Sequence, residues 1–95
     1  MENTTAQLDV RVTGRVHGVG FRMFVRDTAA RLNLTGWVSN EADGSVRVQA
    51  FGPRPTLNTL LAALHRGPHM ARVDHVESIW GTPGGAVPDW FEVRG

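Results

Sequence analysis

The sequence predicts an α+β two-layer sandwich, in which two helices cover one face of an antiparallel sheet. Short stretches of alternating apolar and polar residues are typical of half-buried strands. Two stretches with apolar residues at helical spacing lie between these strands, and glycine, proline and Asp-Gly signals mark the turns. The length of 95 residues suits one domain. We expect that domain over residues 1–95, with about the first seven residues as a flexible N-terminal extension.

The first two elements are a strand and a helix. Leu8–Thr13 alternates apolar and polar residues, which predicts a strand. From Phe21 to Leu32, apolar or small residues recur at helical spacing. Asn33 tolerates positive φ and therefore suits the end of this helix.

The next two elements form a hairpin. Gly36–Asn40 predicts a second strand, and Ser45–Phe51 alternates regularly as a third. Asp43-Gly44 between them is a hairpin signal. The run Gly52–Pro55 then breaks the third strand.

The last part of the chain predicts a helix and two strands. Leucines at helical spacing between Leu57 and Leu64 indicate the helix, which Gly67-Pro68 ends. Val73–Trp80 predicts a fourth strand, and either a bulge or an edge position explains its irregular alternation. A loop rich in glycine and proline spans Gly81–Asp89, and Trp90–Arg94 predicts a short last strand. The order βαββαβ, with this extra strand, gives a ferredoxin-like sandwich of two split βαβ units.

Composition limits the classes of function. The ten basic residues are all arginine and face nine acidic residues, so the net charge of +1 does not favour a nucleic-acid-binding surface. The absence of lysine excludes Schiff-base chemistry, and the absence of cysteine excludes disulfides and thiolate metal sites. No apolar run is long enough for a membrane span and no signal peptide is visible, so we expect a cytoplasmic location and no membrane partner.

The segment between the first strand and the first helix is the strongest candidate for a functional site. Gly14-Arg15-Val16-His17-Gly18-Val19-Gly20-Phe21-Arg22 combines three glycines with an arginine in the first helical turn. Inward-turned backbone N–H groups at a helix N-terminus form an anion cradle, and arginine adds a fork suited to phosphate oxygens. A tight strand-to-helix turn would need the same glycines, so spacing alone leaves both interpretations open.

A second segment, Gly36-Trp37-Val38-Ser39-Asn40-Glu41-Ala42-Asp43-Gly44, adds to the first. Together they resemble the acylphosphatase family, whose members share G-x-V-Q/H-G-V-x-F/Y-R and G-W/F-V-x-N-x-x-D-G. Gly67–Val73 and Phe91–Arg94 also resemble the family, so the similarity covers nearly the whole chain from Leu8. The departures are Asn33 in place of glycine, Ser39 in place of a frequent arginine, and the variable loop 81–89.

The resemblance implies an enzyme that hydrolyses acyl phosphates, with inorganic phosphate as product or inhibitor. It implies that Arg22 binds substrate and that Asn40 is catalytic. It also implies that backbone amides of the loop bind the phosphate, namely those of Val16, His17, Gly18, Val19, Gly20 and Phe21. We expect no cofactor and no metal, since the residue clusters that a metal site needs are missing from the sequence. A monomer is the default expectation, and nothing in the loop residues selects the acyl group.

Two alternatives use the same fold. One is a ferredoxin-like anion- or ligand-binding module without turnover, and the other is an acylphosphatase-like domain directed at carbamoyl phosphate. We interpret His17 as support for the loop, Asp43 as part of the turn, and Glu41 as a solvated charge rather than a general base. We expect Trp37 in or near the core, where it would fix the strand that carries Asn40.

Overall fold

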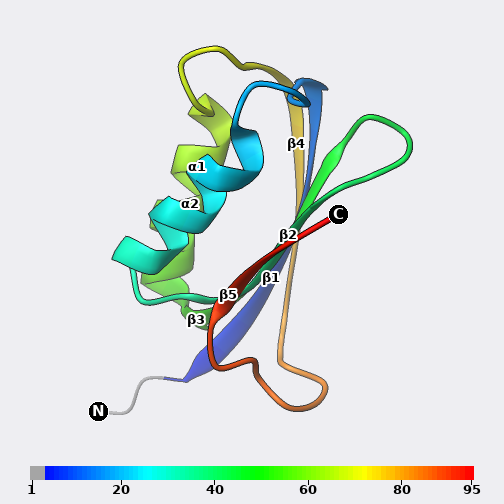
Figure 1. Cartoon of the computed structure of the whole chain (residues 1–95). Helices are drawn as coiled ribbons and strands as arrows, with labels where there is room; N and C mark the ends of the chain where they lie inside the picture. Colours follow the sequence, from blue (N-terminus) through cyan, green and yellow to red (C-terminus); the bar gives the residue numbers. More distant parts are fainter. Residues whose placement is uncertain (1–3) are drawn as a thin grey trace.

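The computed structural model describes residues 4–95. Its elements are β1 (Thr5–Arg15), α1 (Phe21–Arg31), β2 (Thr35–Asn40), β3 (Val46–Pro53), α2 (Arg54–Arg66), β4 (Arg72–Gly81) and β5 (Phe91–Arg94). The strands form one sheet in the order β4-β1-β3-β2-β5. Both helices lie on one side of this sheet, and its other face is open (Figure 1). The ferredoxin-like fold class predicted from the sequence is confirmed.

The core lies between the helices and one face of the sheet. Each central strand sends alternate residues inward, as Val10 on β1, Val38 on β2 and Val48 on β3 do. The helices contribute residues at three- and four-residue spacing, such as Phe21, Val25 and Ala29 on α1, and Leu57, Leu60 and Leu64 on α2. Burying this apolar stripe, rather than helix propensity alone, holds both helices on the sheet.

The first strand is longer than the sequence predicts. It begins at Thr5, and residues 5–7 pair with β3 through Thr5↔Pro53, Ala6↔Gly52 and Gln7↔Phe51. The N-terminal extension expected over residues 1–7 therefore does not include these three residues, because backbone pairing with β3 continues through them. Residues 1–3 lie outside the part of the chain that the structure describes.

The fourth strand is irregular because it has both a bulge and an edge position, the two explanations that the sequence left open. β4 lies at the edge of the sheet. Its register against β1 shifts at Thr13/Gly14, so that Thr13 pairs with His75 while Gly14 pairs with Val73. Asp74 is the extra residue, and the bulge brings Val73 to the side of Val76, where both pack against the core.

The last strand makes the sheet mixed rather than purely antiparallel. β5 pairs with β2 in parallel, through Gly36↔Phe91 and Val38↔Val93. The loop over residues 82–90 carries the chain from β4 at one edge to β5 at the other, which makes this parallel pairing possible. Sequence periodicity does not indicate the direction of so distant a pairing.

Trp37 does not lie in the core, where the sequence predicts it. It is half-buried on the open face of the sheet, and Val38 takes the inward position on β2. Trp37 lies opposite Gln49 and donates its indole N–H to Gln49 Oε1 at 3.2 Å. The guanidinium groups of Arg47 and Arg94 lie 5.9 and 4.8 Å from its ring centre. The strand alternates, and placing valine inward leaves the indole N–H free to find a polar partner.

Among residues 4–95, neither helix has the length and hydropathy needed to cross a membrane.

Candidate active site

The topology brings the predicted site residues to one end of the sheet. β1 and β2 are both antiparallel to β3, so they run in the same direction. The loop after β1 therefore lies at the same end as Asn40, the last residue of β2. β5 is parallel to β2, so its last residue, Arg94, reaches this end as well. Figure 1 shows the loop and the β2–β3 hairpin at the same end of the molecule, with β5 running toward that end.

A pocket of about 170 Å³ lies where these segments meet. Its lining residues come from the glycine loop, from the first turn of α1 and from the ends of two strands: Val16, Gly18, Gly20, Phe21, Arg22, Met23, Asn40 and Val93. The structure thus brings together Arg22, Asn40 and four of the six predicted loop residues. His17 and Val19 do not line the pocket. No motif in the sequence marks Met23 or Val93, because their apolar side chains carry no catalytic signal.

The loop requires glycine for its backbone conformation. Gly18 and Gly20 have φ values of 70° and 76°, a left-handed region that other residues rarely adopt. A Cβ atom at either position would meet nothing within 4 Å, so the requirement is conformational and not spatial. Gly20 is the N-cap of α1, with no side-chain cap and no acidic residue in the first turn. The free N–H groups of this turn and the positive end of the helix dipole therefore favour an anion here.

Arg22 is held by the opposite end of the chain. Its Nη1 donates to the backbone carbonyl of Arg94 at 3.0 Å. A guanidinium has five N–H donors in a planar fork, so this contact leaves donors for an anion. The sequence did not indicate the contact, because it depends on the parallel pairing of β5 with β2.

The side chain of Asn40 has an acceptor without a donor. Its Oδ1 is buried, and no group within residues 4–95 donates a hydrogen bond to it. A buried polar atom in this state is destabilising, by about 1–3 kcal/mol, unless a ligand or a water molecule hydrogen-bonds to it. Asn40 also lines the pocket, so its unpartnered acceptor lies in a residue of the pocket wall.

The hairpin that follows Asn40 is tied to the glycine loop through Ser45. The Ser45 carbonyl accepts from the backbone N–H of Glu41 at 2.9 Å and from His17 Nε2 at 2.8 Å. A carbonyl oxygen only accepts, so His17 Nε2 carries the hydrogen in this contact. The contact supports the interpretation of His17 as a residue that stabilises the loop.

Asp43 holds the turn itself. One carboxylate oxygen accepts from the backbone N–H and the hydroxyl of Ser45, at 2.9 and 2.6 Å, and the other accepts from Arg11. The hydrogen bonds from Ser45, followed by the one from Arg11, hold the pKa of Asp43 well below its usual range. The same contact with Asp43 raises the pKa of Arg11. Asp43 therefore acts in the turn, as the sequence predicts.

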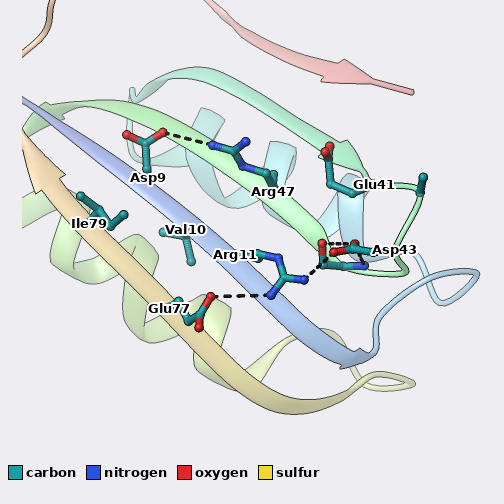
Figure 2. Close-up of a pocket in the computed structure, with 10 residues that line it drawn as sticks. Asp9, Val10, Arg11, Glu41, Asp43, Arg47, Glu77 and Ile79 are labelled. Atoms are coloured by element: carbon teal, nitrogen blue, oxygen red, sulfur yellow. Dashed lines mark hydrogen bonds and ion pairs between the residues drawn. The ribbon is translucent and has the colours of Figure 1, made fainter.

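A larger hollow, of about 510 Å³, lies on the open face of the sheet (Figure 2). Its two arginines pair with carboxylates: Arg11 with Asp43 and with Glu77 at 3.6 Å, and Arg47 with Asp9 at 4.0 Å. Glu41, which could be considered a general base, lines this hollow and not the pocket beside Asn40. The hollow contains neither Arg22 nor Asn40, and both of its arginines are paired with carboxylates instead of converging on a ligand.

Titratable ligands do not gather into a metal centre in the described part of the chain. Within residues 4–95, no three or more His, Cys, Asp or Glu side chains are grouped so that they could hold a metal ion. The polar groups of the small pocket are instead a guanidinium, a carboxamide and backbone amides.

Comparison with known proteins identifies the family of the chain. The sequence model of the family described as Acylphosphatase matches residues 8–92. An acylphosphatase from Salinibacter ruber is 50% identical over 91 residues, which cover 96% of this chain and 95% of that protein. The crystal structure of acylphosphatase from Bacillus subtilis superposes with a TM-score of 0.90 at 32% identity, covering 95% of this chain and 99% of that one. The acylphosphatase structure from Coxiella burnetii gives 0.86 at 37% identity, covering 96% and 94%. The family resemblance of the two sequence motifs is thus confirmed, and the chain is an enzyme of the acylphosphatase family.

Proposed function

We propose that this chain hydrolyses the carboxyl–phosphate bond of acyl phosphates, releasing a carboxylate and inorganic phosphate. Family membership supports this activity. In the mechanism we propose, Arg22 and the amides of Val16–Phe21 hold the phosphate, and Asn40 orients the attacking water. The small pocket is the site of this reaction.

One observation carries the mechanism: Asn40, whose buried Oδ1 accepts no hydrogen bond from residues 4–95, lines the same pocket as Arg22. A water that donates one O–H to Oδ1 is fixed in orientation and keeps an oxygen lone pair for attack on the phosphorus. Holding the water in this position makes the in-line attack effectively unimolecular and so lowers its entropic cost. An amide is a weak base, so Asn40 orients the water without accepting its proton.

Charge on the phosphate is balanced by fixed donors. Arg22 is anchored through Arg94 and offers its remaining N–H groups. The left-handed glycines let the loop fold close to the anion, and the N-terminus of α1 adds its dipole. Preorganised donors of this kind stabilise the transition state without having to reorganise during the reaction.

The reaction balances without a general acid. The water oxygen forms a bond to phosphorus while the bond from phosphorus to the acyl oxygen breaks. The electron pair of the broken bond leaves with the carboxylate, which is stable as an anion, and the water proton passes to the phosphate. Neither Glu41 nor His17 lines the pocket, which supports a mechanism with no side-chain base.

Steady-state hydrolysis of benzoyl phosphate in excess chelator tests the proposal. Arg22→Ala and Asn40→Ala should each lower kcat/KM by about 10²–10³-fold, the effect of removing a preorganised donor or orienting group. Arg26→Ala and Asn58→Ala are matched controls, since Arg26 pairs with Asp27 on α1 and Asn58 is exposed on α2. Both controls should retain the wild-type rate.

Three outcomes would contradict the proposal. Full turnover in either pocket variant would remove that residue from the mechanism. Phosphate binding without turnover in the wild type would favour a ligand-binding module. Efficient hydrolysis of carbamoyl phosphate, with little of benzoyl phosphate, would favour a carbamoyl-phosphate-directed domain.

A further inference from the structure

The small pocket has an apolar side that the proposed mechanism does not use. Met23 and Val93 line the pocket, the first from α1 and the second from β5. The other two apolar side chains of the lining, Val16 and Phe21, are each only 1% exposed and belong to the core. Met23 is 47% exposed, and Val93 is half-buried. Met23 and Val93 therefore provide the apolar surface at the mouth of the pocket.

The rest of the mouth offers little to a bound acyl group. Gly18 and Gly20 are exposed but have no side chain. Arg22 and Asn40 are engaged with the phosphate and the water in the proposed mechanism. Among the lining side chains, Met23 and Val93 are therefore left to contact an acyl group that projects from the held phosphate.

We propose that Met23 and Val93 form the subsite for the acyl group and select apolar, especially aromatic, acyl phosphates over small polar ones. This inference rests on the proposed function. No hydroxyl or carboxylate side chain lines the pocket to pair with a polar acyl group. An apolar acyl group gains by covering the exposed surface of Met23, and the flexible thioether makes favourable contacts with aromatic rings.

The test compares two substrates in matched variants of the full chain. Met23→Gln keeps an unbranched side chain of similar length but makes its end polar, while Met23→Leu keeps it apolar. Met70→Gln is the control, because Met70 is 61% exposed and does not line the pocket. The measured quantities are kcat/KM for benzoyl phosphate and for carbamoyl phosphate, and the inhibition constant of inorganic phosphate. The two substrates differ in intrinsic reactivity. This difference cancels when the ratio of their kcat/KM values is compared between variants.

The Met23→Gln variant should lower the ratio of benzoyl to carbamoyl kcat/KM by about fivefold, as expected for a partly exposed apolar contact. Met23→Leu should keep the ratio, and so should Met70→Gln. The inhibition constant of phosphate should stay the same in all variants, because the subsite contacts only the acyl group.

An unchanged ratio in an active Met23→Gln variant would overturn the inference while leaving the proposed function intact. A parallel change in the phosphate inhibition constant would also overturn it, because Met23 would then act through Arg22 or the loop. A wild-type protein that hydrolyses neither substrate would instead overturn the proposed function, and the subsite with it.

Discussion

Arg22 and Asn40 are held in the pocket in different ways. Arg22 is anchored by a hydrogen bond to the Arg94 carbonyl, 72 residues away in sequence. Asn40 is placed by the end of β2, and its Oδ1 has no partner within residues 4–95. In the mechanism we propose, the first arrangement fixes a cation for the phosphate, and the second leaves an acceptor for the attacking water. Both motifs were visible in the sequence, but the anchor of Arg22 was not, because it depends on where the C-terminus lies.

Substituting Arg22 by lysine tests whether the fork matters or only the charge. A lysine ammonium is a point charge that cannot hold the Arg94 carbonyl and two phosphate oxygens in one plane. We expect Arg22→Lys to lower kcat/KM for benzoyl phosphate by about 10²-fold and to weaken phosphate inhibition. Arg26→Lys, on the same helix, is the control and should behave as wild type. A lysine variant as active as the wild type would show that charge alone suffices.

Asp43 gives the turn a predictable pH dependence. Its pKa is lowered in the folded chain, by Ser45 and then by Arg11, so the folded state binds fewer protons than the unfolded state. The resulting stabilisation is present above the unfolded pKa of about 4 and is lost as pH falls below it. We therefore expect Asp43→Asn to be less stable than wild type between pH 5 and 7, with the difference shrinking toward pH 2. Urea unfolding across this range checks the sign, and a difference that grows as pH falls would contradict it.

The elements around the site depend on contacts between loops. Ser45 accepts from His17 in the glycine loop and from Glu41 in the hairpin, and Asp43 joins the same turn to Arg11 on β1. The loop that would hold the phosphate and the strand that carries Asn40 are thereby connected. Sequence spacing predicts both motifs, yet this connection becomes visible only when the backbone places His17 against Ser45.

Substitutions of His17 test that connection. His17→Ala removes the donor to the Ser45 carbonyl, and the loss of one such hydrogen bond should weaken inhibition by inorganic phosphate about fivefold. His17→Gln should retain wild-type inhibition, because the amide of glutamine can donate to the same carbonyl. If His17 were a general base, glutamine would be as damaging to kcat as alanine. That result would contradict the supporting role.

Strand patterns predicted most elements, and the exceptions have physical reasons. The irregular alternation of Val73–Trp80 indicated a bulge or an edge, and β4 has both. Trp37 and Val38 are adjacent and both apolar, so the sequence alone does not show which one faces the core. The structure places Val38 inward beside Val48 and leaves Trp37 opposite Gln49 on the open face. In this orientation the indole N–H of Trp37 keeps a partner, Gln49 Oε1.

At the scale of the whole molecule, the topology assembles the site. β1, β2 and β5 run in the same direction, so the glycine loop, Asn40 and Arg94 meet at one end of the sheet. The sequence predicted the ferredoxin-like order of elements. That order already brings the glycine loop and Asn40 together. The sequence did not predict that β5 would close the pocket, with Val93 in its wall. The pocket is also smaller than the hollow on the open face, so size alone would not have identified it.

In the mechanism we propose, Asn40 acts on the water and Arg22 on the phosphate. The most direct test is to measure kcat for benzoyl phosphate together with the inhibition constant of inorganic phosphate in Asn40→Ala. We predict that kcat falls by about 10²-fold or more while the inhibition constant stays close to the wild-type value, because the orienting group is lost and the phosphate cradle is kept. A variant with near wild-type kcat, or one whose phosphate inhibition weakens as much as its turnover, would contradict the account.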